Sequence, residues 1–221
     1  MTRRTFVIAI DGPAASGKSS TAQMVAEKLG YLHVDSGSLY RAATAAMLRA
    51  ERDASKWTEQ GVLDAAGPVE VRAARTSFFP VLQGRAIEDE IRGAEVTDSV
   101  SRVARMPRVR EWVNDKVREA ASSRDVVVDG RDMGTVVFPD ADLKIFLVAD
   151  SRERAARRLR QRGTPASQQV LDDETIRINE RDARDALQTV PAADAVVIDT
   201  TGLTQQQQVE QIVILSKQRS A

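Results

Sequence analysis

Short apolar segments recur along the chain and are separated by longer amphipathic segments. Runs that are apolar on both faces are typical of strands in a parallel sheet that helices cover on both sides. The pattern predicts strands at 6–10, 126–128, 144–148 and 196–198, with a weaker one at 31–34. It predicts helices at 18–29, 39–49, 108–121, 152–162, 173–187 and 205–216. Strands that alternate with helices in this way indicate an α/β fold with a doubly wound parallel sheet of about five strands.

Polar residues follow the predicted strands at the points where they end. Asp11-Gly12, Asp35-Ser36, the segment Asp129–Asp132 and Asp150 all occupy such positions. Because the carboxyl ends of parallel strands meet at one edge of the sheet, we expect these residues to share a site there.

The predicted elements describe one domain over residues 1–221. About 55 residues between the second and third predicted helices contain no clear strand–helix unit, which is too long for a loop in a compact domain. We therefore interpret roughly 60–105, which contains Phe78, Phe79 and Pro80, as an inserted subdomain.

The charge balance excludes one class of function. The chain has 32 basic and 32 acidic residues and only 4% aromatic residues, whereas a nucleic-acid-binding module would show net positive charge and exposed aromatic side chains. Most of the basic residues are arginines. Two explanations stay open for this, a GC-rich coding bias and a need for guanidinium groups that bind phosphate oxygens in pairs.

The expected location is the cytoplasm, without a membrane partner. The chain has no cysteine, so disulfides, thiol catalysis and cysteine-based metal sites are excluded. The first apolar run, Phe6–Ile10, is too short for a signal peptide. No segment approaches the roughly 18 apolar residues of a membrane span. We expect a monomer.

The segment from Gly12 to Ser19 matches the pattern G-x-x-x-x-G-K-[ST] between a predicted strand and a predicted helix, the context that a phosphate-binding P-loop requires. Its backbone N–H groups would hold the phosphates of ATP, Lys18 would reach the β- and γ-phosphates, and the Ser19 hydroxyl would join the shell of a Mg²⁺ ion. The predicted nucleotide-binding residues are Gly12, Pro13, Ala14, Ala15, Ser16, Gly17, Lys18, Ser19 and Ser20. A P-loop by itself leaves a kinase, a GTPase switch and a motor open.

Several further motifs distinguish these classes. They are Asp35-Ser36-Gly37-Ser38-Leu39-Tyr40-Arg41, Gly84 with Ile91-Arg92, Val100–Ala104 with Pro107–Arg110, Val128–Thr135, Arg154–Arg158 and Arg181–Asp185. With these motifs the chain resembles the bacterial cytidylate kinase family over almost its whole length. The resemblance implies transfer of the γ-phosphoryl group of ATP to CMP or dCMP in pyrimidine nucleotide metabolism.

The resemblance also implies roles for individual residues. Ser36, Arg41 and Arg131 would hold the acceptor phosphate; Ser101, Arg110 and Asp132 would read the cytosine; Arg181 and Asp185 would lie at the ribose. Arg154, Arg157 and Arg158 would lie under a lid, roughly 152–180, that closes over ATP. Of all these residues, we expect Lys18, Arg131, Arg154 and Arg158 to take part in catalysis and Arg157 to bind ATP. Arginines and Mg²⁺ suit this reaction because they neutralise charge where it develops.

Other interpretations of single residues stay open. Ser101 also suits a helix N-cap, and Asp185 suits a surface pair with Arg181 one helical turn away. Asp129 suits either a loop position or a carboxylate that holds Mg²⁺ through water. His33, the only histidine, is expected to be a strand residue and not a ligand.

The chain departs from the family pattern at one place. The family has an arginine three residues after the position of Asp185, where this chain has Gln188. The following segment is about four residues short. Arg184 is a possible substitute for the missing contact with the phosphates.

Two other functions remain as alternatives. One is a P-loop kinase with a broader acceptor, such as a UMP/CMP-type enzyme. The other is a nucleotide-dependent switch or binding module. A GTPase switch needs an N-K-x-D motif, which Asn114-Asp115-Lys116 does not supply.

Overall fold

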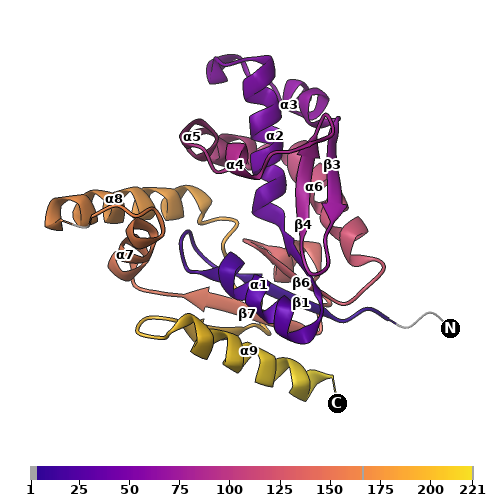
Figure 1. Cartoon of the computed structure of the whole chain (residues 1–221), viewed down its shortest axis with the longest axis vertical. Helices are drawn as coiled ribbons and strands as arrows, with labels where there is room; N and C mark the ends of the chain where they lie inside the picture. The colour runs from indigo at the N-terminus through magenta and orange to yellow at the C-terminus, as the bar shows by residue number, and fades with distance from the viewer. Residues whose placement is uncertain (1–3, 166, 221) are drawn as a thin grey trace.

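The computed structural model describes residues 4–165 and 167–220, so position 166 of the expected lid lies outside the described residues. Its centre is a parallel sheet with the strand order β2-β6-β1-β7-β8 (Figure 1). The strands are β1 (Val7–Asp11), β2 (Leu32–Asp35), β6 (Val126–Gly130), β7 (Leu143–Val148) and β8 (Val196–Asp199). The five strands predicted from the apolar runs are confirmed, each boundary within two residues.

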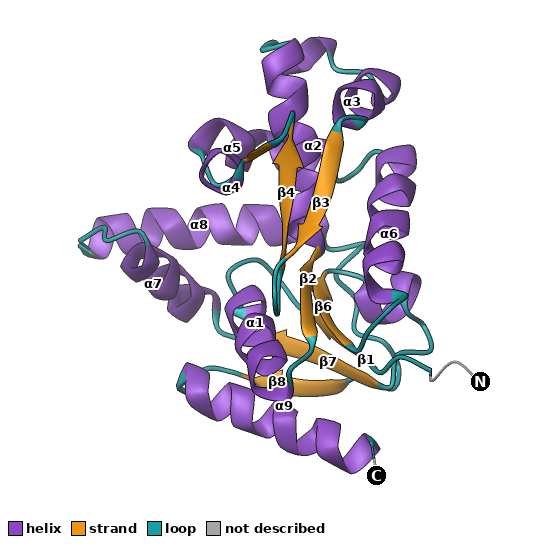
Figure 2. Ribbon diagram, turned by 45° about the vertical axis from the view of Figure 1, so that its right-hand side comes forward, coloured by secondary structure: helices purple, strands orange, loops and turns teal. Residues whose placement is uncertain are grey.

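Helices cover both faces of this sheet, as Figure 2 shows. In β1, Ile8 and Ile10 pack under one pair of helices, α1 and α9, whereas Val7 and Ala9 face the core under α2 and α6. The bounds are α1 (Lys18–Leu29), α2 (Ser36–Ala50), α6 (Pro107–Ala121) and α9 (Gln205–Arg219). Because both faces of the strands are buried, their sequences are continuously apolar instead of alternating.

Two helix starts differ from the prediction by more than one residue because capping residues, not apolar periodicity, set them. Helix α2 begins at Ser36 instead of 39, where the Asp35 carboxylate accepts the N–H of Ser38. Helix α8 (Gln168–Asp185) begins five residues before the predicted 173, where the Ser167 hydroxyl accepts the N–H of Val170. Helix α7 (Ser151–Gln161) precedes it, and together α7 and α8 form an arm beside the sheet (Figure 1).

The segment interpreted as an insertion contains elements that the sequence pattern did not resolve. They are α3 (Glu59–Ala66), β3 (Val69–Ala73), β4 (Phe78–Leu82), β5 (Arg85–Ala86), α4 (Glu88–Ile91) and α5 (Ala94–Val103), after a short 3₁₀ turn at Ala54–Lys56. The three strands form a separate antiparallel sheet in the order β3-β4-β5. Pro80 within β4 hides the strand in the sequence, since proline normally argues against one.

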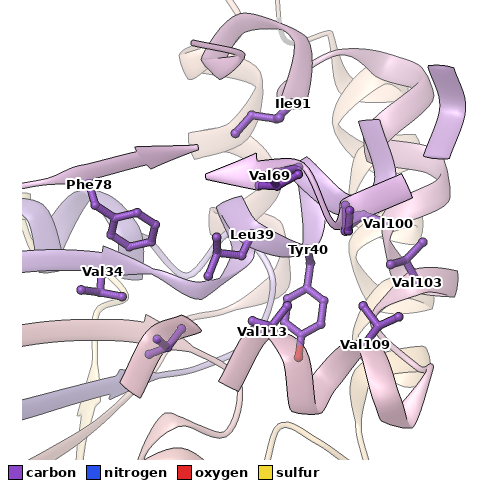
Figure 3. Packing of buried hydrophobic residues seen from close by; sticks show 14 of the residues in the cluster. Val34, Leu39, Tyr40, Val69, Phe78, Ile91, Val100, Val103, Val109 and Val113 are labelled. Atoms are coloured by element: carbon purple, nitrogen blue, oxygen red, sulfur yellow. The ribbon is translucent and has the colours of Figure 1, made fainter. Parts of the chain in front are cut away.

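This segment packs on the same core as one face of the main sheet. Figure 3 shows Val69 and Phe78 of the small sheet near Leu39 of α2, with Val34 of β2 in the same cluster. Val100 and Val103 of α5 lie beside Val109 and Val113 of α6. Helix α5 is thereby positioned over the carboxyl edge of the main sheet, where the site lies.

Candidate active site

The strand ends meet at one edge, as the sequence predicts. Asp35 pairs in register with Asp129, and Ile10 pairs with Asp129 from the other side, so that β2, β6 and β1 end together. Asp150 instead begins α7, where its carboxylate accepts the N–H groups of Arg152 and Glu153. Asp150 therefore has a capping role in the fold.

A cleft of about 1190 Å³ opens above this edge and reaches from the P-loop to α5. Most of the residues that the sequence analysis selected line this single cleft. They are Ala14, Ala15, Gly17, Lys18, Ser19, Ser20, Ser36, Arg41, Ser101, Arg110, Asp129, Arg131, Asp132, Arg157, Arg158, Arg181 and Asp185. Four other selected residues, Gly12, Pro13, Ser16 and Arg154, are not among those that line it.

The loop between β1 and α1 depends on glycine at two positions. Gly12 has φ +154°, and a Cβ there would lie 2.4 Å from the Leu147 carbonyl oxygen. Gly17 has φ +89°, a left-handed conformation that glycine adopts without strain. Ala15 also has a positive φ of 58°. Consecutive turns of this kind direct backbone N–H groups into a concave anion site, which opens at the N-terminus of α1.

Lys18 is the buried cation of this loop. Its side chain is 8% exposed, and Nζ donates to the Pro13 carbonyl oxygen at 3.1 Å. Burial, with a smaller contribution from Arg131, lowers the pKa of Lys18 from 10.5 to about 7. An anion in the cleft would remove this penalty, because it would give the ammonium group a partner of opposite charge.

Further cations converge on the same space. Burial, followed by Arg131, lowers the pKa of Arg181 to about 10. Burial also lowers the pKa of Arg41 and of Arg158, and neighbouring arginines act in the same direction. Several guanidinium groups held close together with too few carboxylates form a binding site for a multiply charged anion.

Two residues at the α5 end of the cleft form an ion pair. Arg110 Nη2 of α6 donates to Asp132 Oδ2, and its Nη1 donates to the Ala104 carbonyl oxygen at 3.1 Å. Burial raises the pKa of Asp132, while Arg110 opposes that effect. Ser101 lies within α5 and not at its start, so the N-cap interpretation of this residue is wrong. The cleft is thus lined here by the Ser101 hydroxyl, the Asp132 carboxylate and the Arg110 guanidinium.

The remaining acceptor-side candidates are held by their neighbours. Ser36 Oγ donates to the Asp129 carbonyl oxygen at 2.8 Å, and Arg41 Nη1 donates to the Ile91 carbonyl oxygen at 3.1 Å. Asp185 Oδ2 lies 3.4 Å from Arg131 Nε and 3.7 Å from Arg181 Nε. The Asp185 carboxylate is therefore shared between two arginines, one of them far from its own helix, and is more than a surface pair.

The three arginines selected on α7 lie in different environments. Arg158 Nε pairs with Glu174 Oε1 of α8 at 3.0 Å, and Arg157 donates to Thr200 and to Glu153. Both line the cleft. Arg154 is 6% exposed and faces the back of the P-loop instead.

Ser19 and Asp129 lie next to each other at the start of α1. Ser19 Oγ donates to Asp129 Oδ2 at 2.5 Å, and the carboxylate is 1% exposed. The other Asp129 oxygen, Oδ1, lies 2.7 Å from His33 Nε2. His33 is a strand residue, as expected, and this carboxylate is its polar partner. A hydroxyl and a carboxylate are hard oxygen donors of the type that Mg²⁺ prefers.

The Asp11 carboxylate holds the segment that directly follows Asp132 in place. Asp11 accepts the N–H groups of Met133 at 2.9 Å and Gly134 at 2.8 Å, which begin a π-helical turn, η2 (Met133–Val137). Burial raises the pKa of Asp11 to about 6. These bonds join the end of β1 to the segment that directly follows Asp132.

Several residues that line the cleft had no expected role from the sequence, among them Tyr40, Arg92 and Gln208. Gln208 Oε1 of α9 accepts the Thr21 hydroxyl of α1 at 3.0 Å. Tyr40 and Arg92 belong to the family motifs given above, and those motifs were the only sequence signal for a role of these two residues. Gln208 had none, because a glutamine in an amphipathic helix is ordinary.

The described ranges, 4–165 and 167–220, contain no helix long and apolar enough to cross a bilayer. They also contain no cluster of three or more histidine, cysteine, aspartate or glutamate side chains able to hold a metal ion.

Comparison with known proteins gives consistent matches along the chain. The family model described as Cytidylate kinase matches residues 8–218. A cytidylate kinase of Bordetella bronchiseptica is 44% identical over 211 residues, which cover 94% of this chain and 93% of that protein. One of Acholeplasma laidlawii is 38% identical over 214 residues, covering 95% and 94%. The crystal structure of an uncharacterized protein of Eubacterium ventriosum, 12% identical, aligns with a TM-score of 0.55 over 96% of this chain and 99% of that one, a similarity of fold alone.

Proposed function

The chain belongs to the cytidylate kinase family, and from that premise we propose how its residues carry out the reaction. The protein is an ATP-dependent nucleoside-monophosphate kinase that transfers the γ-phosphoryl group of ATP to CMP or dCMP, giving ADP and CDP or dCDP. The observation that best supports the residue roles is that one cleft contains both the P-loop and the paired Arg110 and Asp132. The family findings do not favour a broader UMP/CMP-type acceptor or a nucleotide switch.

The donor end of the cleft is the P-loop. Backbone N–H groups of the loop and the N-terminus of α1 bind the phosphates of ATP, and Lys18 reaches the β- and γ-phosphates. Lys18 Nζ donates to the Pro13 carbonyl oxygen in a buried position where its charge is unfavourable. Arg157 and Arg158 on α7 contact ATP from the lid side.

The acceptor end binds CMP. Arg41, Arg131 and Ser36 hold its phosphate, while Arg181 and Asp185 lie at the ribose. A CMP phosphate oxygen attacks the γ-phosphorus of ATP, the bond from that phosphorus to the bridging oxygen breaks, and the bond electrons remain on the ADP leaving group. No general base is needed, because a phosphate monoester is largely ionised at neutral pH. Catalysis then depends on charge neutralisation by Lys18, Arg131 and Arg158.

The site fits a Mg²⁺ ion that accompanies ATP. When bound with ATP, Mg²⁺ would neutralise phosphate charge. Ser19 would supply a hydroxyl ligand, and Asp129 would hold the ion through water. Ser19 Oγ donates to Asp129 Oδ2, so the two groups lie at a common place.

The two substrates also suggest where the protein works. ATP and nucleoside monophosphates are cytoplasmic metabolites, so we place the enzyme there. We propose that it works as a monomer.

The first test is substrate choice. In an ADP-release assay with Mg²⁺ and ATP, we expect turnover with CMP and dCMP and much lower kcat/KM with UMP, because cytosine presents an amino donor and a ring acceptor to Asp132 and Arg110, whereas uracil presents a carbonyl and a ring N–H. The matched control omits the monophosphate and measures ATP hydrolysis by water. Equal use of CMP and UMP would contradict the base assignment.

The departure at position 188 gives a second test. Gln188 lines the cleft, whereas Arg184 is exposed and its Nε donates to the Glu180 carbonyl oxygen at 3.1 Å. Gln188→Arg should therefore raise kcat/KM roughly fivefold, the effect of one added charge-assisted bond worth about 1 kcal/mol. Steady-state kinetics with CMP and ATP varied separately would measure it.

Arg184→Ala is the matched control and should leave both kinetic constants near the wild-type values, since its side chain does not line the cleft. A loss of activity in Arg184→Ala, with no gain in Gln188→Arg, would mean that Arg184 compensates for the missing arginine.

A further inference from the structure

Helix α8 contacts the back of the P-loop through one carboxylate, Asp182. Its Oδ1 accepts the Ala14 N–H at 3.1 Å, and its Oδ2 accepts Arg154 Nη1 at 2.6 Å. The same Arg154 nitrogen donates to the Ala14 carbonyl oxygen at 2.8 Å, and Arg154 Nε donates to the Ala149 carbonyl oxygen at 3.0 Å. Both backbone polar groups of Ala14 are thus bonded to this pair of side chains.

These bonds act on a strained part of the loop. Ala14 is buried, and Ala15, which follows it and lines the cleft, has a φ of 58°. A residue with a Cβ adopts this conformation only where the surrounding structure holds it. The Ala14 carbonyl and the Ala15 N–H belong to one planar peptide group and point in opposite directions. Arg154 therefore fixes the direction of the Ala15 N–H.

The arginine itself depends on Asp182. Arg154 is 6% exposed, and a guanidinium group buried without a carboxylate would be costly. Asp182 supplies that charge from a helix about 28 residues further along the chain. Without it, we expect Arg154 to leave the Ala14 carbonyl and the loop to lose its fixed shape.

The helix that carries Asp182 also carries acceptor-side residues. Arg181 and Asp185 lie on the same helix and line the cleft, and Asp185 reaches Arg131. Asp182 of α8 thus bonds to the P-loop, whereas its neighbours Arg181 and Asp185 on the same helix line the acceptor side of the cleft. A shift of α8 relative to the P-loop would move Asp182 and these acceptor residues together.

We propose that Asp182 is a positioning residue that, together with Arg154, holds the Ala14 peptide in its phosphate-binding geometry and couples the P-loop to the acceptor residues on α8. This role rests on the proposed function, since it concerns binding of ATP and CMP in that cleft. The proposal gives Arg154 a supporting role at the P-loop in place of the catalytic role expected from the family resemblance.

The test compares Asp182→Ala with the wild-type enzyme by titration calorimetry. Three dissociation constants are measured: for a non-hydrolysable ATP analogue with Mg²⁺, for CMP alone, and for CMP with the analogue at saturation. We expect Asp182→Ala to weaken analogue binding about tenfold, the effect of losing one charge-assisted bond. CMP alone should bind within about twofold of wild type, and any gain in CMP affinity that the analogue gives the wild-type enzyme should be lost.

Three further variants sharpen the result. Asp182→Asn keeps an oxygen for the Ala14 N–H but loses the charge for Arg154, so its effect should be intermediate. Arg154→Ala combined with Asp182→Ala should be no worse than the more damaging single change, because the two side chains act as one unit. Glu180→Ala, an exposed acidic position on the same helix, is the matched control and should bind like wild type.

Two results would overturn the proposal. One is unchanged analogue binding in Asp182→Ala. The other is an equal loss of affinity for both ligands accompanied by a lower melting temperature, which would mean that Asp182 only supports the fold. A failure of the kinase assignment would give a different result from either of these. In that case the wild-type enzyme would release no ADP with CMP in the substrate assay.

Discussion

Replacing Lys18 with methionine is expected to lower kcat by about three orders of magnitude or more, the scale on which one cation at a transferring phosphoryl group acts. Methionine nearly matches the length of the buried side chain and removes its charge, together with its hydrogen bond to the Pro13 carbonyl. The loss should appear mainly in kcat, because Lys18 stabilises charge that develops during transfer. Lys28→Met, at the partly exposed end of the same helix, is the matched control and should keep normal turnover.

The same substitution should stabilise the free enzyme at low pH. In the folded chain burial lowers the pKa of Lys18 from 10.5 to about 7, so the folded state disfavours the charged form. The resulting penalty is present below about pH 7 and is relieved as the pH rises toward 10.5, because over that range the unfolded state binds more protons. Lys18→Met should therefore melt at a higher temperature than wild type at pH 6, and the difference should shrink by pH 9.

Thermal unfolding followed by circular dichroism at the two pH values would check this. Near-normal turnover of a folded Lys18→Met variant would contradict the assignment of the P-loop. An unchanged melting temperature at pH 6 would contradict only the burial of a charged Lys18.

The second large effect concerns the base. Cytosine presents an amino donor at C4 and acceptors at N3 and O2, whereas uracil presents a carbonyl at C4 and a donor at N3. The Asp132 carboxylate, which pairs with Arg110, accepts from the cytosine amino group and repels the uracil carbonyl. Arg110 only donates, so it suits cytosine N3 or O2. Two buried mismatches of about 1–3 kcal/mol each give a preference for CMP over UMP of roughly two to four orders of magnitude.

Asp132→Asn should narrow this preference, mainly through a lower kcat/KM for CMP, because an amide can turn to donate to the uracil carbonyl. The measurement is kcat/KM for CMP, dCMP and UMP on both enzymes. Asp115→Asn, on the exposed face of α6, is the matched control and should retain the wild-type preference. An unchanged ratio in Asp132→Asn would exclude this carboxylate from base recognition.

The amino-acid sequence was sufficient to predict the strands of the main sheet and the donor site. The strands are apolar on both faces and need no knowledge of their neighbours to be recognised, as Val126–Val128 illustrates. The P-loop is likewise local, since Gly12 to Gly17 form one continuous segment that leads into α1 and depends on glycine at fixed positions. The acceptor residues came from family motifs. Ser36, Arg131 and Asp132 follow strands whose ends meet at one edge, whereas helices α2, α5, α6 and α8 bring the others to the cleft.

The sequence was insufficient where tertiary packing outweighs local signals. The small sheet β3-β4-β5 has a proline in its middle strand and is held by packing on α2, not by periodicity. The start of α8 is a different case, because it depends on a local signal, the Ser167 cap, that apolar spacing does not reveal.

Only the folded chain determined which arginines face the cleft. Arg154, Arg157 and Arg158 are equivalent in sequence, all on one basic helix. The fold directs Arg157 and Arg158 toward the cleft and buries Arg154 against the P-loop. Its partner Asp182 is distant in the chain, and so are Asp11 from Met133 and His33 from Asp129. Such pairs arise because a buried charge or polar group must find a partner wherever the fold places one, and no spacing along the sequence encodes that choice.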